Sequence, residues 1–248
     1  MNDDLSRLIV AITGASSGIG EATARACARA GAAVSLAARR KERIDELARE
    51  ITAEGGRAIA IETDVSEEAQ AAEFVHRTAS ELGRVDVLVN NAGVMLLGPI
   101  NGADTGEWRR MINANVYGVL YCTHAALPLM LEQGSGHIVN VSSVAGRFAR
   151  AGSGVYNLTK FGVGAFSEAL RQEVAPAGVR VTLIEPGAVA TELGSHNRPE
   201  IIDAMRKMFA DVTPLESADI ARAVLYAISQ PPNVAVNEVL VRPSGQVR

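Results

Sequence analysis

Tyr156 and Lys160 are four residues apart in a stretch whose apolar pattern predicts a helix. This spacing places the two side chains on one face of the helix. A free tyrosine has a pKa of about 10, which is too high for efficient proton transfer near neutral pH. Because a nearby ammonium favours the phenolate and lowers that pKa, the pair predicts a tyrosine that exchanges a proton with the oxygen of a carbonyl or an alcohol.

Ser142 and Ser143 end an apolar run that precedes the tyrosine in the chain. A hydroxyl beside Tyr156 would hold and polarise the oxygen that receives the proton. If both serines are strand residues, their side chains point to opposite faces of the sheet, so only one of them reaches the tyrosine. A tyrosine and a lysine at this spacing are common in proteins, and the pair gains a functional meaning only together with other motifs.

A glycine-rich segment, residues 13–20 with the sequence Thr-Gly-Ala-Ser-Ser-Gly-Ile-Gly, joins the first predicted strand to the first predicted helix. Its glycines permit a tight turn and a close approach to a pyrophosphate, and the helix start adds free N–H groups. A dinucleotide site is the favoured interpretation. The alternative is a strand–helix turn that needs glycine for geometry alone. The candidate cofactor-binding residues here are Gly14, Ser16, Ser17, Gly18, Ile19 and Gly20.

The end of the second predicted strand distinguishes NAD from NADP. A fold that prefers NAD usually carries an acid there for the ribose 2′-hydroxyl, but this chain has Arg39 and Arg40 and no acid before Glu42. A guanidinium binds a phosphate through charge-assisted hydrogen bonds. Arg39 is therefore the first candidate for binding the 2′-phosphate of NADP(H), assisted by Ser17 and Arg40. The alternative is that both arginines are solvated at the start of a helix.

Short apolar segments rich in valine and isoleucine alternate with longer amphipathic segments along the chain. This alternation predicts the α/β class, with right-handed strand–helix–strand units in one doubly wound, seven-stranded parallel sheet flanked by helices. Aromatic residues are only 4% of the chain, so aliphatic side chains must fill the core, as in a parallel sheet buried on both faces. The predicted strands are 8–13, 33–37, 58–62, 87–90, 137–141, 180–185 and 239–241, and the predicted helices include 20–30, 41–54, 67–82, 107–131 and 155–174.

One long irregular stretch follows the sixth predicted strand, at residues 187–199. No linker or composition shift divides the chain, so residues 1–248 are predicted to form a single domain. A long loop in a compact domain is often a functional lid, and ligands of open parallel sheets bind at the carboxyl ends of the strands, where this loop lies. We therefore expect a substrate lid at about residues 187–212, with residues 194–199 as its mobile part.

The charge pattern argues against large charged partners. The net charge is −4 without any block of like charges, which disfavours nucleic acid and anionic membranes as partners. Residues 1–4 do not resemble a signal peptide, and no apolar run reaches the roughly 18 residues of a membrane span. Cys27 and Cys122 show no metal-ligand spacing with each other or with a histidine. We expect a cytoplasmic protein without a metal site that acts on a small molecule.

Three further side chains are candidates for substrate contacts. Arg147 and Arg150 fall between the serine pair and the tyrosine, so they should border the mouth of the site. They either clamp a carboxylate or phosphate of the substrate or are solvated loop cations, and the second interpretation is favoured. His196 lies in the expected lid, where it could touch the substrate.

Taken together, the motifs resemble those of the short-chain dehydrogenase/reductase family in order and approximate spacing. The resemblance covers nearly the whole chain and implies a Rossmann fold. The matching segments are residues 13–20, Asn90-Asn91-Ala92-Gly93, Asn115, Ser142-Ser143, Tyr156 with Lys160, and Pro186-Gly187.

The resemblance also implies roles for individual residues. The catalytic tetrad would be Asn115, Ser143, Tyr156 and Lys160, with Asn115 holding a water that links Lys160 to solvent. Lys160 would also bind the nicotinamide ribose. The family's members imply a homo-oligomer, a tetramer or a dimer, built mainly on helices 107–131 and 155–174. The implied cofactor contacts beyond the glycine-rich turn are Arg39, Arg40, Asp64, Val65, Asn91, Ala92, Gly93, Tyr156, Lys160, Pro186, Gly187, Val189 and Thr191.

The C-terminal segment 232–243 is similar to the ending of reductases of 3-hydroxy acids and small aldehydes, such as the clavulanate-forming reductase and the serine-type dehydrogenases. We expect an NADPH-dependent oxidoreductase that reversibly reduces a ketone or aldehyde, with the proton coming from Tyr156. One alternative is a 3-oxoacyl-(acyl-carrier-protein) reductase, although the Gly-Gly ending common in that group is absent. The other is a non-catalytic NADP-binding sensor or scaffold, which the presence of all four tetrad residues disfavours.

Overall fold

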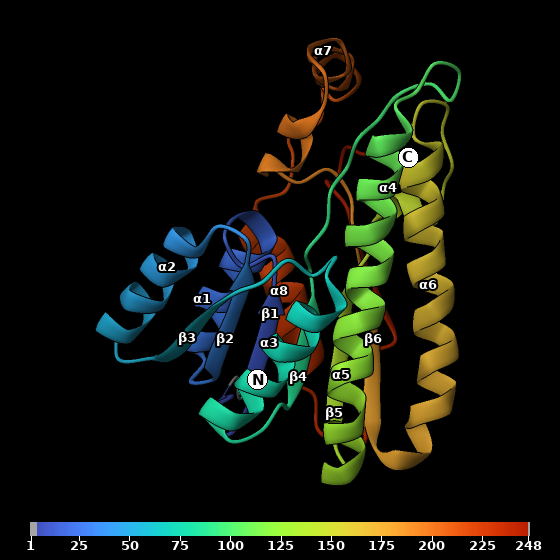
Figure 1. The fold of residues 1–248 in the computed structure, drawn as a ribbon. Coiled ribbons are helices and arrows are strands. Elements are labelled where there is room, and N and C mark those ends of the chain that lie inside the picture. Colours follow the sequence, from blue (N-terminus) through green and yellow to red (C-terminus); the bar gives the residue numbers. More distant parts are fainter. Residues whose placement is uncertain (1–3, 248) are drawn as a thin grey trace.

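The computed structural model describes residues 4–247, which form one seven-stranded parallel sheet with helices on both sides (Figure 1). The strand order is β3-β2-β1-β4-β5-β6-β7, so the chain starts near the middle of the sheet and winds outwards in both directions. The predicted doubly wound sheet is confirmed. The strands are β1 (Ile9–Thr13), β2 (Ala33–Ala38), β3 (Arg57–Glu62), β4 (Val87–Asn90), β5 (Gly136–Val141), β6 (Val179–Pro186) and β7 (Glu238–Val241).

Two layers of helices bury the two faces of the sheet. Side chains alternate along each strand, so Val10 and Ile12 of β1 pack with α1, α2 and α8, while Ala11 packs with α3, α5 and α6. Within residues 4–247, no helix has both the length and the apolar composition that a membrane span requires. The helices are α1 (Gly18–Arg29), α2 (Lys41–Ala53), α3 (Glu68–Leu82), α4 (Thr105–Ile112), α5 (Gly118–Gln133), α6 (Gly154–Val174), α7 (Pro199–Met208) and α8 (Ser217–Ile228).

The segment predicted as one helix over residues 107–131 contains a π-helical turn, η1 (Asn113–Tyr117), between α4 and α5. The backbone stays helical through this turn, but the wider winding shifts the side-chain register at its centre. Such turns within α-helices are frequent at functional sites. Hydrophobic periodicity could not reveal it, because α5 is apolar on most of its surface and a shift by one residue leaves no visible break.

The segment after β6 is more regular than the loop expected at residues 187–199. A 3₁₀ turn, η4 (Glu192–His196), leads into α7, which starts at Pro199. Proline is well suited to the first turn of a helix, where its missing N–H is not needed, so here it marks a helix start. None of the residues of α7 is buried, and the helix stands away from the body of the sheet (Figure 1).

Candidate active site

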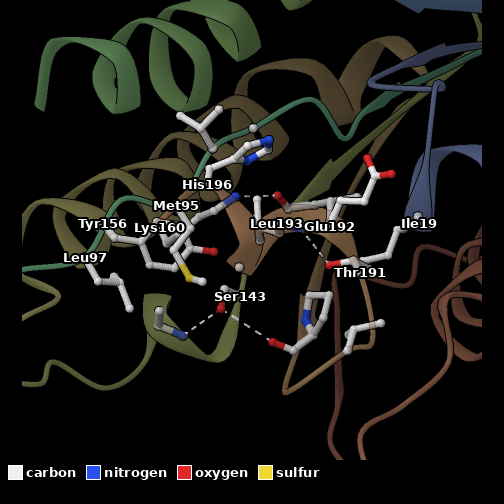
Figure 2. Close-up of a pocket in the computed structure, with 18 of the residues that line it drawn as sticks. Ile19, Met95, Leu97, Ser143, Tyr156, Lys160, Thr191, Glu192, Leu193 and His196 are labelled. Carbon is white, nitrogen blue, oxygen red and sulfur yellow. Dashed lines mark hydrogen bonds between the residues drawn. The ribbon is translucent and has the colours of Figure 1, made fainter. Parts of the chain in front are cut away.

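A cavity of about 1050 Å³ opens at the carboxyl edge of the sheet (Figure 2). This is the edge where open parallel sheets bind ligands, and the volume accommodates a cofactor together with a small substrate. Two predicted residues, Gly20 and Asn115, lie behind the cavity wall. The predicted residues that line it are Gly14, Ser16, Ser17, Gly18, Ile19, Arg39, Arg40, Asp64, Val65, Asn91, Ala92, Gly93, Ser143, Tyr156, Lys160, Pro186, Gly187, Val189 and Thr191.

The glycine-rich turn leaves no room for side chains at two of its glycines. Gly14 has a φ of +67°, and a Cβ there would lie 2.8 Å from the Cα of Ala92. A Cβ on Gly20 would lie 2.3 Å from the carbonyl oxygen of Gly14. Ser17, the N-cap of α1, makes no side-chain hydrogen bond to the helix, so the first-turn N–H groups have no side-chain cap. The turn therefore fits the phosphates of a dinucleotide by its shape and by the helix dipole.

Hydrogen bonds lock this turn to the end of β4. Thr13 Oγ1 accepts from the backbone N–H groups of Asn91 and Ala92, each at 3.0 Å. In return, the side-chain amide of Asn91 donates to the carbonyl oxygens of Thr13 at 3.0 Å and Gly14 at 3.2 Å. The side chain of Asn91 is thus engaged in holding the floor of the cofactor cleft.

Arg40, not Arg39, contacts the glycine-rich turn. Its guanidinium donates to Ser16 Oγ at 2.9 Å and to Ser17 Oγ at 2.7 Å. Arg39 lines the same cavity, but within residues 4–247 no ion pair engages it. The hydrogen bonds to the turn thus come from Arg40, and the choice of Arg39 for the 2′-phosphate stays a prediction. Both arginines follow the end of β2 at Ala38, so the alternation of strand side chains does not tell which of them faces the turn.

Glu192 was not predicted as a site residue, yet it ties the start of η4 to these arginines. Its carboxylate lies 2.8 Å from Arg40 Nη1 and 2.9 Å from Arg43 Nη1. Hydrogen bonds from Arg40 and then from Arg43 lower the pKa of Glu192 to about 2. An acid next to Thr191 carries no motif, so only the three-dimensional contact reveals it.

Ser143 and Tyr156 meet at the wall of the cavity (Figure 2). Ser143 Oγ accepts from the N–H of Ala145 at 3.0 Å and donates to the carbonyl oxygen of Pro186 at 3.5 Å, and the Ser143 side chain acts to lower the pKa of Tyr156. Ser142 is buried on the other side of the strand end, where its Oγ donates to the carbonyl oxygen of Lys160 at 3.1 Å. The alternation of side chains thus brings Ser143 to the tyrosine.

Burial dominates the acidity of Tyr156. It raises the pKa of Tyr156 to about 12, and the hydrogen bond with Ser143 offsets only part of this rise. The ammonium of Lys160 lies 5.8 Å from the centre of the tyrosine ring and donates to the carbonyl oxygen of Val141 at 3.0 Å. Burial also lowers the pKa of Lys160 to about 8. The pKa of Tyr156 is therefore raised and not lowered as the spacing predicted, because loss of hydration is the largest effect on it.

Asn115 lies in the π-helical turn and is buried behind Gly93. Its side chain accepts from the N–H of Val94 at 2.8 Å and donates to the carbonyl oxygen of Val94 at 2.8 Å. A Cβ on Gly93 would lie 3.0 Å from Asn115 Oδ1 and 4.0 Å from Lys160 Nζ, so the two side chains flank this glycine. The structure therefore brings Asn115 close to the lysine, while its water-holding role stays a prediction.

The two arginines of the loop after β5 have different surroundings. Arg147 Nε lies 2.7 Å and Arg147 Nη2 2.6 Å from the two carboxylate oxygens of Glu185, and Arg147 also pairs with Glu238. Glu185 is 1% exposed, so this guanidinium neutralises a buried carboxylate. Neither predicted role, substrate clamp or solvated cation, applies to Arg147. Among residues 4–247, no carboxylate pairs with Arg150, which lines the cavity, as does His196.

Gln246, near the C-terminus, also shapes the site without belonging to any motif. Its side-chain oxygen accepts from the N–H of Ala188 at 2.9 Å. A Cβ on Gly187 would lie 2.4 Å from that oxygen and 3.2 Å from the Cα of Arg242, so a side chain there would force the C-terminal segment to shift. The end of the chain thus supports the segment that follows β6, a contact between residues that are distant in sequence.

Comparisons with known proteins agree with this geometry. The sequence model of the short chain dehydrogenase family matches residues 8–201. The chain belongs to the short-chain dehydrogenase/reductase family. An uncharacterised oxidoreductase of Staphylococcus saprophyticus is 41% identical over 245 residues, which cover 96% of each protein.

Solved structures extend the similarity to the whole fold. The closed form of a serine dehydrogenase complexed with NADP⁺ superposes with a TM-score of 0.90 at 36% identity, covering 97% of each chain. An alcohol dehydrogenase from the archaeon Thermococcus sibiricus, complexed with 5-hydroxy-NADP, gives a TM-score of 0.87 at 31% identity, covering 96% of this chain and 97% of that chain. The predicted Rossmann fold and the assignment to oxidoreductases of CH–OH groups are confirmed, and both neighbours hold the type of cofactor that was predicted.

Proposed function

We propose that this protein is an NADPH-dependent reductase that converts a ketone or aldehyde into an alcohol, reversibly. The observation that supports this most strongly is that the side chains of Ser143 and Tyr156 line the wall of a cavity that also contains the glycine-rich turn. Bound NADPH supplies the hydride. The two hydroxyl groups hold the carbonyl oxygen, and Tyr156 gives it a proton.

The tyrosine is in the protonated form that reduction requires. Burial raises the pKa of Tyr156 to about 12, so its hydroxyl carries the proton at neutral pH, while a pKa so far above neutral also makes that proton harder to release. The ammonium of Lys160 lies beside the ring of Tyr156, and burial lowers its pKa to about 8. In this proposal Lys160 takes part in the proton relay that returns a proton to Tyr156. Asn115 fixes the backbone next to Lys160 and completes the proposed tetrad.

We propose that the cofactor binds in the same cavity as the catalytic residues. The glycine-rich turn and the start of α1 are placed for the pyrophosphate, and Arg40, with Ser16 and Ser17, is placed for the 2′-phosphate. Arg39 lines the same end of the cavity and is proposed to assist. Val189 and Thr191 border the nicotinamide end in this proposal.

The wider organisation is also a proposal. Residues 187–212, which include η4 and α7, form the substrate lid of a single domain. The exposed apolar side chains of Tyr117, Leu158 and Phe161 on η1 and α6 support a homo-oligomer, a tetramer or a dimer, joined through α5 and α6. The proposed cellular location is the cytoplasm.

The test is turnover with a substitution that removes only the acid. NADPH oxidation is followed across ketones, aldehydes, 3-oxo acids and 3-oxoacyl thioesters, with NADH in parallel. For the Tyr156→Phe variant we expect kcat to fall about 10³-fold, because general acid catalysis contributes a factor of this order. Binding of NADPH, measured by fluorescence titration, should stay within about twofold because the hydroxyl is the only group lost.

Two results would contradict the proposal. Full turnover by the Tyr156→Phe variant would place the chemistry elsewhere in the cavity. Tight NADPH binding by the wild type without turnover of any carbonyl would instead support the non-catalytic sensor or scaffold.

A further inference from the structure

We propose that Arg150 binds a carboxylate on the substrate, so that the reductase acts on oxo acids in preference to neutral carbonyl compounds. This inference rests on the proposed function. Arg150 lines the cavity, and across residues 4–247 no carboxylate lies within ion-pair distance of its guanidinium. Its one side-chain hydrogen bond is to the sulfur of Met208 at 3.2 Å, and a thioether is a weak acceptor.

The charges around the substrate end of the cavity have one sign. The acids among the lining residues are Asp64 and Glu192. Glu192 is held by two arginines beside the glycine-rich turn, and Asp64 accepts hydrogen bonds from the N–H and hydroxyl of Ser66 at the end of β3. The other charged or titratable groups that line the cavity away from the glycine-rich turn are the guanidinium groups of Arg110, Arg150 and Arg206, the imidazole of His196, and the pair Tyr156 and Lys160. This end of the cavity is therefore complementary to an anion.

Asn157, the residue after Tyr156, fixes the backbone of Arg150 relative to the catalytic tyrosine. Asn157 is 4% exposed, and its Oδ1 accepts from the backbone N–H of Arg150 at 3.3 Å and from Ser153 Oγ at 2.6 Å. Its Nδ2 donates to two carbonyl oxygens of the same loop, those of Ala145 at 2.7 Å and Phe148 at 2.8 Å. The side chain of Arg150 is exposed and able to turn towards a ligand, while its backbone is fastened to the start of α6.

The neighbouring arginines are less suited to this role. Arg147 is engaged by the buried Glu185 and by Glu238. Arg206 lies 3.3 Å from Asp203 one helical turn earlier on α7, so an acid of its own helix already balances its charge. A carboxylate accepts two parallel hydrogen bonds from one guanidinium, and Arg150, whose loop is fastened to Asn157 beside Tyr156, has these donors to offer.

The experiment compares two substrates that share a ketone and differ in charge, acetoacetate and methyl acetoacetate, in wild type and four variants. For the wild type we expect kcat/KM to favour the acid by about tenfold or more, as a bidentate contact of about 1.4 kcal/mol gives. Arg150→Ala should abolish this preference by raising the KM for acetoacetate, while kcat/KM for methyl acetoacetate should not change. Arg150→Lys should keep part of it, because the charge remains and the planar fork is lost.

Arg206→Ala separates the two cations of the mouth, and Arg77→Ala on α3, where Arg77 pairs with Glu81, controls for loss of an arginine far from the cavity. An acid preference that disappears with Arg206 and survives Arg150→Ala would overturn the assignment, and so would a wild type that reduces the ester as well as the acid. Absence of turnover with every carbonyl would refute the proposed function instead. In that case acetoacetate is titrated into the NADPH complex and followed by fluorescence: binding that Arg150→Ala abolishes supports the carboxylate site, and absence of binding to the wild type overturns it.

Discussion

The cavity has one wall made by residues 13–20 and 90–93 and an opposite wall made by residues 144–153 and 187–212, and the two are built in different ways. In the first wall, glycine lets two backbones approach closely, since a Cβ on Gly14 would lie 2.8 Å from the Cα of Ala92. The side chains of Thr13 and Asn91 then join these two strand ends through four hydrogen bonds to backbone groups. In the second wall, side chains support loops, and α7 contributes no buried residue. The first wall is thus a fixed surface for the part of the ligand that all dinucleotide enzymes share, and the second is free to vary with the substrate.

Because the first wall has no spare room, we expect one added methyl group there to lower cofactor affinity and stability more than the same addition elsewhere in the molecule. In Gly14→Ala, the new Cβ would lie 2.8 Å from the Cα of Ala92 on a backbone with φ of +67°. Positive φ costs a non-glycine residue about 1–2 kcal/mol before the clash is counted. We expect NADPH affinity to fall about 100-fold and the melting temperature to fall by several degrees, measured by fluorescence titration and thermal unfolding.

Gly162→Ala is the matched control for that substitution. Gly162 lies inside α6, and a Cβ there would meet no atom within 4 Å. Alanine in a helix interior is more stable than glycine by about 0.5–1 kcal/mol, so this variant should melt higher and bind NADPH as the wild type does. Equal effects of the two substitutions would show that the glycine-rich turn is no tighter than an exposed helix face.

The same contrast decides what the sequence could reveal. The glycines of the turn were predictable because backbone geometry leaves no other residue type, and the strands were predictable because both faces of the sheet are buried. Asn157 and Gln246 were not, since each acts through hydrogen bonds to loops whose positions depend on the whole fold. The tyrosine pKa was predicted with the wrong sign because the spacing of Tyr156 and Lys160 contains no information on burial.

Lys160 lies where the two walls meet, and its burial makes a prediction for stability against pH. Burial lowers its pKa from 10.5 to about 8 in the folded protein. Below pH 8 the folded chain bears the full cost of a buried ammonium, and this cost disappears as pH rises towards 10.5, where the unfolded chain also loses the proton. We expect Lys160→Met to be more stable than the wild type at pH 7 by about 1–3 kcal/mol, although it loses activity.

The measurement is denaturant unfolding of both proteins from pH 7 to 10.5. The advantage of Lys160→Met should shrink steadily above pH 8, and taking the difference between the two proteins cancels the titration of Tyr156, which they share. An advantage that stays constant over this range would mean that the ammonium is not the source of the cost.

The smallest expected effect concerns the ion pair between Glu192 and Arg40, which joins the two walls. Glu192 belongs to the variable wall, but its carboxylate pairs with Arg40, the residue proposed to bind the 2′-phosphate of the cofactor. Two anions then compete for one guanidinium. Glu192→Gln should therefore tighten NADPH binding about threefold, a change of about 0.7 kcal/mol that is small because both groups are solvent-exposed. Binding of NADH, which lacks the phosphate, should not change.

Fluorescence titrations with both cofactors at two salt concentrations check this prediction, and Glu200→Gln on α7 serves as the control for loss of an exposed acid. Screening weakens repulsion between exposed charges, so the gain should diminish at high salt. If Glu192→Gln instead weakens NADPH binding, the carboxylate orients Arg40 and Arg43 for the phosphate and does not compete with it. In that case the start of η4 would belong with the fixed wall, and the boundary between the two walls would fall after Glu192.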